Sequence, residues 1–132
     1  MYACSKNGEN EGTGRPGFRG TVMKSLDGGA HWFSITEGLS VDQDFYDLIV
    51  DPFEPDVIYL AAQHDGMFIS RDGGASWSSW NQGLDGRIPA TNGNNVTRVL
   101  ALSADGRYLY FGSEGAGVFR REIHPEIERQ TQ

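Results

Sequence analysis

One eight-residue peptide occurs twice in this chain, and its recurrence limits the fold more than any other feature of the sequence. SLDGGAHW runs over 25–32 and SRDGGASW over 70–77, with six of eight positions identical and a separation of 45 residues. Apolar segments recur around it at a similar offset: DLIV at 47–50 returns as VLAL at 99–102, VIYLAA at 57–62 as YLYFGS at 108–113, and GMFIS at 66–70 as GVFRR at 117–121. A period of this length indicates a repeat architecture.

Each repeat contains short runs of β-branched and aromatic residues separated by Gly, Pro and Asp, a pattern that favours antiparallel strands. In the middle repeat we expect strands at about 46–50, 57–62, 67–70 and 76–80. A four-stranded unit of roughly 40–50 residues is typical of a β-propeller blade. The predicted fold class is therefore all-β, with propeller blades of four-stranded antiparallel sheets.

The repeats divide the chain into three predicted blades. We expect the first at about 1–38, the second at about 44–83 and the third at about 96–122, followed by a frayed tail at 123–132. The first and third repeats each have room for three strands, so the prediction is about ten strands, or two and a half blades. A closed propeller needs about four to eight blades. We therefore expect either a C-terminal piece of a larger propeller or a protomer that closes by assembly.

The repeated peptide is predicted to be a hairpin turn with a structural role. Asp-Gly favours tight turns because Gly accepts positive φ, and Asp and Ser side chains bond to nearby backbone N–H groups. The tryptophan that ends each copy is expected to bury its ring over the hairpin. The structural positions are Ser25, Asp27, Gly28, Gly29 and Trp32 in the first copy and Ser70, Asp72, Gly73, Gly74 and Trp77 in the second.

The pattern S-x-D-G-G-x-x-W resembles the Asp-box, or BNR repeat, of sialidase-type β-propellers. The stretch over 51–84 is similar to blades of xyloglucanase-type glycoside hydrolases, sortilin-like receptors and photosystem II assembly factors, and the resemblance covers about Tyr2 to Glu122. In those families the box is a structural turn at the periphery of the propeller. The resemblance implies a fold rather than one activity, and a secreted or periplasmic location more than a cytoplasmic one.

Composition excludes several classes of function. The chain has 18 acidic and 11 basic residues, a formal charge of −7, which argues against binding nucleic-acid phosphates or anionic membranes. One cysteine allows no intrachain disulfide, and no apolar run approaches the roughly 18 residues of a membrane span. The three histidines, His31, His64 and His124, have no metal-ligand spacing, so no metal or other cofactor is predicted.

Strand direction predicts where a ligand would bind. Alternating strands place the repeated turns at one end of the sheets, and the long connections at 5–19 and 83–95 at the opposite end, here called the loop end. Because loops longer than a turn requires often carry binding residues, we expect a ligand there. Tyr46 and Arg98 would either face a central channel or pack between blades. The candidate ligand-binding residues are Asp42, Asp44, Tyr46, His64, Asp65, Arg98 and Glu114.

Two functions fit these features. The first is a non-catalytic module that binds a protein or a glycan through the loop end, with further blades or self-association completing the propeller. The alternative is a fragment of a sialidase- or xyloglucanase-like glycoside hydrolase, which needs two carboxylates about 5–10 Å apart. Acids of the loop end could supply that pair, or be solvated loop acids only. The GRIP sequence at 86–89 resembles the sialidase arginine motif but follows a box instead of preceding one. Without a complete catalytic set, the first function is preferred and no catalytic residue is predicted.

Overall fold

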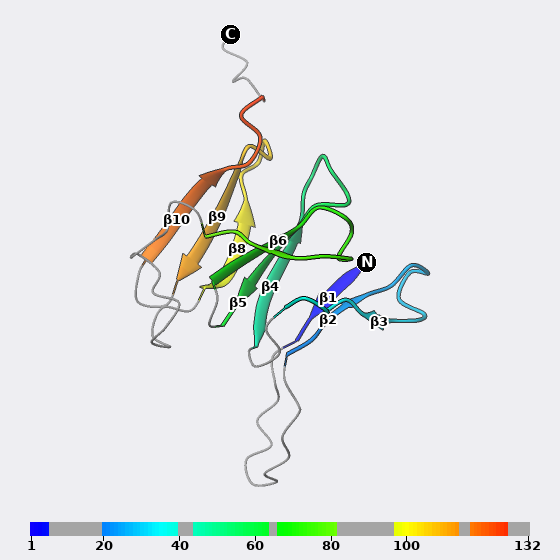
Figure 1. The fold of residues 1–132 in the computed structure, drawn as a ribbon. Helices are drawn as coiled ribbons and strands as arrows, with labels where there is room; N and C mark the ends of the chain where they lie inside the picture. Colours follow the sequence, from blue (N-terminus) through cyan, green and yellow to red (C-terminus); the bar gives the residue numbers. More distant parts are fainter. Residues whose placement is uncertain (6–19, 40–43, 64–65, 82–96, 114–116, 127–132) are drawn as a thin grey trace, which may run out of the picture.

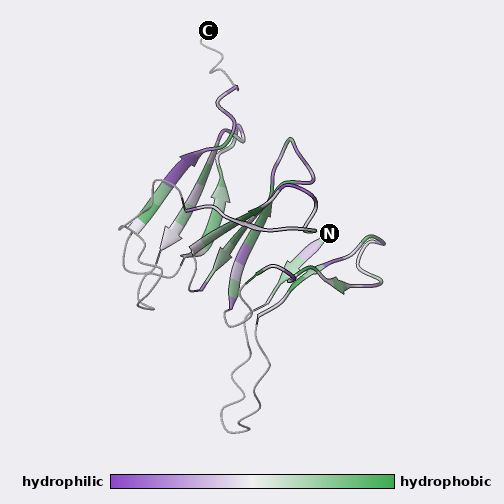
Figure 2. Ribbon diagram, in the orientation of Figure 1, coloured by the Kyte–Doolittle hydropathy of each residue, from purple (hydrophilic) through white to green (hydrophobic). Residues whose placement is uncertain are grey.

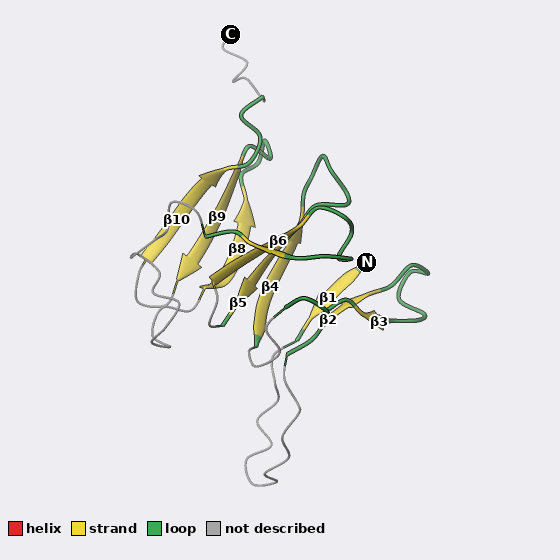
Figure 3. Ribbon diagram, viewed as in Figure 1, coloured by secondary structure: helices red, strands yellow, loops and turns green. Residues whose placement is uncertain are grey.

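The computed structural model describes residues 1–5, 20–39, 44–63, 66–81, 97–113 and 117–126. These residues form strands, turns and loops without a helix (Figure 3). The ten strands in chain order are β1 (Tyr2–Cys4), β2 (Val22–Lys24), β3 (Phe33–Ser34), β4 (Phe45–Val50), β5 (Ile58–Ala62), β6 (Gly66–Ser70), β7 (Ser78–Ser79), β8 (Thr97–Leu102), β9 (Tyr108–Ser113) and β10 (Gly117–Glu122).

The strands make three antiparallel sheets that stand side by side in a row (Figure 1). The first sheet has the order β1-β2-β3, the second β4-β5-β6-β7 and the third β8-β9-β10, so neighbours in sequence are neighbours in space. The strands β4 and β8 of adjacent sheets also contact each other. The predictions of an all-β fold, antiparallel sheets and about ten strands are confirmed.

The second sheet is covered on both of its faces. Its strands β5 and β6 are buried at every position, and Figure 2 shows them as largely hydrophobic. Facing residues pair in register, as in Leu60 with Phe68 and Tyr59 with Ile69. Because alternate residues of a strand point to opposite faces, a strand that is buried at every position requires a neighbour on each side.

Two hydrophobic clusters fill the spaces between the sheets. Between the first and second sheets lie Val22, Ile35, Phe45, Leu60 and Phe68, among others. Between the second and third lie Tyr59, Met67, Trp80, Leu109 and Phe111, among others. The core of this chain is therefore an inter-sheet core, in which each sheet depends on the next for burial of its apolar face.

The fourth strand of the second sheet is shorter than the expected 76–80. Only Ser78 and Ser79 pair with β6 as a strand, and the Trp80 N–H then donates to the Met67 carbonyl at 2.8 Å. The Asn81 side chain accepts from the Met67 N–H at 2.9 Å. The Met67 N–H thus bonds to a side chain instead of to a backbone carbonyl of the neighbouring strand, and the strand pairing ends there.

The start of the C-terminal tail is held against the third sheet. The N–H groups of Ile123 and His124 both donate to the Arg107 carbonyl, at 2.8 and 3.2 Å. The His124 side chain is buried. This part of the tail differs from the frayed segment expected from the sequence because His124 finds a buried carboxylate partner, described below. Residues 127–132 lie outside the described part of the chain.

Candidate functional site

The first repeated turn, at 25–32, is held by bonds among its own residues. The Ser25 hydroxyl donates to Asp27 Oδ1 at 2.8 Å and accepts from the Gly29 N–H at 2.9 Å. The Asp27 carboxylate accepts the His31 N–H at 2.8 Å, and its second oxygen lies 2.6 Å from His31 Nδ1. These bonds from His31 hold the pKa of Asp27 below its ordinary value. The Asp27 carboxylate therefore bonds to residues of its own turn and stabilises it.

The second repeated turn, at 70–77, has the same bonds. The Ser70 hydroxyl donates to Asp72 Oδ1 at 2.9 Å and accepts from the Gly74 N–H at 2.8 Å. The Ser76 hydroxyl and N–H both donate to the Asp72 carboxylate and lower its pKa. Gly73 and Gly74 have φ of 69° and 94°, a region that favours glycine. Turn geometry therefore accounts for the Ser, Asp and Gly positions that the two copies share.

The two tryptophans of these turns have different surroundings. Trp77 is half-buried, and its Nε1–H donates across the sheet boundary to the Ile35 carbonyl at 2.8 Å. Trp32 donates to the Gly29 carbonyl of its own turn at 3.0 Å and is 39% exposed. The expectation that both rings are buried does not hold for Trp32, because no described segment packs on the outer face of the first sheet.

The candidate residues of the loop end are only partly described. Asp44 is buried beside the start of β4, where its N–H donates to Gln63 Oε1 at 3.1 Å and its carbonyl accepts the Gln63 N–H. Tyr46 is half-buried in β4, and only the backbone of Arg98 in β8 is described. The remaining candidates lie outside the described residues: Asp42, His64, Asp65 and Glu114.

Tyr46 and Arg98 occupy corresponding irregularities of their sheets. The register of β4 against β5 shifts between Phe45 and Asp47, and that of β8 against β9 shifts between Thr97 and Val99. Each shift leaves one residue, Tyr46 or Arg98, as the extra residue of a β-bulge. A bulge interrupts the regular alternation of a strand, and both bulges lie at the loop end of their sheets.

The described residues form a cavity of about 290 Å³ at the opposite end, between the second and third sheets. We call this the junction pocket. At this end of the sheets, the Gly73 N–H donates to the Asp56 carbonyl at 2.8 Å and so joins the second repeated turn to the β4–β5 turn. Its lining residues are Asp51, Glu54, Tyr59, Ile69, Arg71, Trp80, Arg121, Glu122, Ile123, His124 and Glu126.

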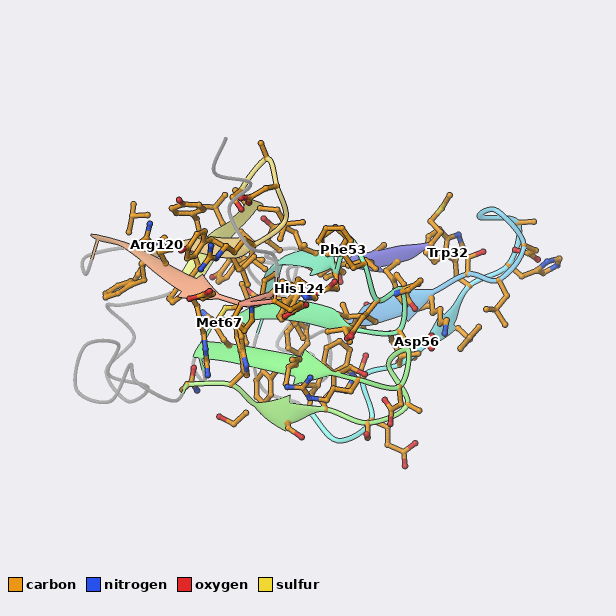
Figure 4. All side chains as sticks on the ribbon, turned by 90° about the horizontal axis from the view of Figure 1, so that it is seen from above. Trp32, Phe53, Asp56, Met67, Arg120 and His124 are labelled. Carbon is orange, nitrogen blue, oxygen red and sulfur yellow. The ribbon has the colours of Figure 1, made fainter. Side chains whose placement is uncertain are left out.

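A buried hydrogen-bond network lies on one wall of this pocket. His124 Nε2 lies 2.7 Å from both oxygens of Asp51, and His124 Nδ1 lies 2.6 Å from Glu126 Oε1. The Tyr59 hydroxyl donates to Asp51 at 2.8 Å. The Phe53 ring meets the His124 ring edge-on at 5.1 Å between centroids, and Figure 4 shows both near the centre of the row of sheets. We call this the Asp51–His124 clasp.

The clasp shifts the pKa of each of its members. Burial alone would lower the pKa of His124, but the bonds to Glu126 and Asp51 outweigh it and the pKa is raised. Burial would raise the pKa of Asp51, but donors from Phe53, Tyr59 and His124 outweigh it and the pKa is lowered. Burial and the Asp51 carboxylate raise the pKa of Tyr59. The two carboxylates therefore favour the charged form of the imidazole, and the phenol remains a donor.

Two arginines, Arg71 and Arg121, also line the pocket. The Arg121 guanidinium lies over the Trp80 ring at 3.9 Å from its centroid and donates to the Trp80 carbonyl at 2.9 Å. Arg71 is exposed at the variable position of the second repeated turn. The pocket thus offers the exposed Arg71 together with acidic groups, and most of its lining residues are charged.

This arrangement favours binding over catalysis. The Asp51 carboxylate accepts from two backbone N–H groups, from Tyr59 and from His124, so it has no proton to give and no acceptor site directed to a ligand. Glycoside hydrolysis requires two carboxylates that flank a sugar, whereas Asp51 and Glu126 flank an imidazole. Within the described ranges, no cluster of three or more His, Cys, Asp or Glu could hold a metal ion.

Sequence reasoning did not find this pocket. It classed His124 as an isolated histidine in a tail, and Asp51 as part of a turn, because the two are 73 positions apart. The one available signal was the repeat itself. Consecutive repeat units pack against each other, which puts the sheet that precedes Asp51 next to the sheet that precedes Ser103.

Comparison with known proteins shows the fold. A solved structure described as YCF48 bound to D1 peptide superposes with a TM-score of 0.57 at 16% sequence identity, over 78% of this chain and 31% of that one. The chain thus spans about a third of the length of that β-propeller protein, and its three sheets are part of a β-propeller. No protein-family profile matches the chain. Curated protein sequences give no match either. None of the described residues forms a helix with the length and hydrophobicity to cross a membrane.

Proposed function

We propose that this chain is a non-catalytic β-propeller module that binds a peptide segment of another protein. The observation that carries the proposal is the junction pocket, in which Asp51, His124 and Glu126 bond to one another while the exposed Arg71 also lines the cavity. A peptide complex of a β-propeller, YCF48 with D1 peptide, supports this use of the fold. Most of the pocket's lining residues are acidic, basic or histidine side chains, and such groups suit the polar and charged groups of a peptide.

The proposal includes the finer predictions from the sequence. The three sheets belong to blades at about 1–38, 44–83 and 96–122, and the repeated turns are Asp-boxes of the sialidase-like class, with sortilin-like and glycosyl hydrolase-like relatives. The bonds within both turns and the glycine φ values support that assignment. A protein ligand is favoured over a glycan because the pocket combines arginines with carboxylates, a pattern suited to the mixed charges of a peptide.

A displayed peptide library tests the proposal. The immobilised chain is panned against random peptides on phage, and the enriched peptide is titrated by calorimetry against two variants. Arg71→Glu changes the junction pocket, and Tyr46→Ala changes the loop end. We expect Arg71→Glu to weaken binding by about tenfold or more and Tyr46→Ala to leave it within about twofold. Leu26→Arg is the matched control, because Leu26 has in the first repeated turn the position of Arg71 in the second.

The outcomes separate the alternatives. No enriched peptide, with a glycan bound instead on an array, would overturn the protein ligand. Loss of binding with Tyr46→Ala but not Arg71→Glu would move the site to the loop end, with Asp42, His64, Asp65, Arg98 and Glu114 as the next residues to test. Hydrolysis of aryl glycosides that is abolished by Asp44→Ala or Asp65→Ala would establish the enzyme instead.

A further inference from the structure

The charged residues that line the junction pocket divide into two groups, and the first group is bonded within the chain. Asp51 and Glu126 bond to the two nitrogens of His124, at 2.7 and 2.6 Å. Glu122 Oε1 accepts from Nε of Arg107 at 2.9 Å and lies 2.8 Å from its Nη2. Each of these three acids therefore has a basic partner within the chain, and that partner balances its charge.

Arg121 also belongs to the first group. Its guanidinium lies over the Trp80 ring, 3.9 Å from the ring centroid, and its Nη1 donates to the Trp80 carbonyl at 2.9 Å. A guanidinium that stacks on an indole and bonds to the backbone of the same residue is held in one orientation. Arg121 therefore shapes the pocket, and its charge is already engaged by Trp80.

Glu54 and Arg71 form the second group. Both are exposed, and both line the pocket. Among the residues that the structure describes, neither side chain forms an ion pair or a hydrogen bond. Both charges act on the Tyr59 hydroxyl: beside the larger effects of burial and Asp51, Arg71 lowers and Glu54 raises its pKa. One charge of each sign is thus available near the same point of the pocket.

The backbone that carries these two charges is held in place. The Glu54 N–H donates to Oδ1 of the buried Asp51 at 3.1 Å. Arg71 belongs to the second repeated turn, which its own serine and aspartate side chains close by hydrogen bonds. The bond from the Gly73 N–H to the Asp56 carbonyl joins this turn to the β4–β5 turn. The fold therefore sets the distance between the two attachment points, and a ligand has less of the chain to order when it binds.

We propose that Glu54 and Arg71 select the bound peptide by its charge pattern. Glu54 pairs with a basic residue of the peptide, and Arg71 pairs with an acidic residue at a fixed spacing from it. The inference rests on the proposed function and specifies its ligand as a segment with charges of both signs. Opposite charges that meet across an interface fix the register of the partners, and like charges that meet there reject a wrong partner.

Panning a phage-displayed random peptide library against forms of the whole chain tests the inference. The unmodified chain is expected to enrich peptides with one acidic and one basic residue at a constant spacing. Arg71→Glu is expected to enrich peptides with two basic residues, and Glu54→Arg peptides with two acidic residues. Glu37→Arg is the matched control, because Glu37 is exposed, lies outside the pocket lining and gives the same change in net charge as Glu54→Arg. It is expected to enrich the same peptides as the unmodified chain.

Calorimetry with one selected peptide and its charge-swapped form makes the test quantitative. In the swapped form, arginine replaces the acidic residue and glutamate replaces the basic one. Each single variant is expected to bind the original peptide about tenfold or more weakly. The double variant of Glu54→Arg with Arg71→Glu keeps the net charge of the unmodified chain, and it is expected to prefer the swapped peptide by about tenfold or more. Urea melts of each variant verify folding.

The outcomes distinguish this inference from the proposed function. A preference that follows the charges from the chain to the peptide supports charge selection. Peptides that Arg71→Glu weakens, but whose charge preference no variant reverses, would overturn charge selection and leave peptide binding in the pocket intact. A double variant that binds the original peptide as tightly as the unmodified chain also overturns it, because Glu54 and Arg71 then pair with each other. No enriched peptide with any form would overturn both proposals.

Discussion

The Asp51–His124 clasp makes a quantitative prediction for the variant His124→Ala. The Asp51 carboxylate accepts from the N–H groups of Phe53 and Glu54, at 2.9 and 3.1 Å, and from the Tyr59 hydroxyl, at 2.8 Å. His124 adds a charged donor at 2.7 Å. The variant removes this donor, the charge and the ring, while the three other donors remain.

The expected cost follows from these contacts. A hydrogen bond to a charged group contributes about 1.5–3 kcal/mol, and the edge-on contact with Phe53 adds about 0.5–1 kcal/mol. Removing one partner of a buried pair can cost about 3–5 kcal/mol, but three donors still solvate Asp51, so the cost falls below that range. We expect a loss of about 2–3 kcal/mol in the free energy of unfolding where His124 is charged.

The loss depends on pH. Because the folded-state pKa of His124 is raised, its contribution is complete below the ordinary value of 6.5 and disappears as the pH rises through the raised value. Because the pKa of Asp51 is lowered, its contribution is present above its ordinary value of 3.8 and disappears as the pH falls through the lowered one. The clasp therefore stabilises the fold most between about pH 4 and about pH 6.5.

Urea denaturation at about pH 5.5 and about pH 8.5 measures this dependence. The cost of His124→Ala is expected to be larger at the lower pH, where the imidazole is charged. Tyr59→Phe is the control: it removes another donor to Asp51, and because the pKa of Tyr59 is raised its cost is the same at both pH values. An equal cost of His124→Ala at both pH values, or a larger one at the higher pH, would refute the reasoning.

Three further predictions concern the turns and the thiol. Trp77→Phe is expected to lower the free energy of unfolding by about 1–2 kcal/mol, because it leaves the Ile35 carbonyl without its donor, whereas Trp32→Phe costs less than about 0.5 kcal/mol; urea melts compare the two. Asp72→Ala is expected to shift the same melts without changing the affinity of a selected peptide, and lost affinity with unchanged stability would contradict a structural role for that turn. Burial and the nearby Asp47 charge raise the pKa of Cys4 to about 11, so labelling by a thiol reagent near neutral pH should be slow until the protein unfolds.

The sheets were predictable from sequence because alternation and turn residues are local signals. Tyr59 and Met67 mark their strands by neighbours a few positions away, and the repeated turns close hairpins by bonds within eight residues. The junction pocket was not predictable in this way. It depends on His124 returning to Asp51 from another sheet, and no local pattern encodes which tail residue reaches a buried acid.

At the loop end, the sequence identified candidate residues but not the positions of their side chains. Its acids were identified because loop length is visible in a sequence, but loop length does not determine where the side chains lie. Asp44 lies buried beside β4 instead of in an open loop. Tyr46 lies at a β-bulge, which moves one residue out of the regular alternation and is not marked by residue type.

The clasp also bears on the order in which this chain folds. Within each sheet, strands pair with their neighbours in sequence, so the hairpins close short loops and form early. The contact between Asp51 and His124 spans 73 positions and requires the second and third sheets to be in place. We therefore expect this contact to form after the rate-limiting step of folding, and a contact that forms late slows unfolding more than it speeds folding. On this expectation, His124 slows the separation of two sheets that have already assembled.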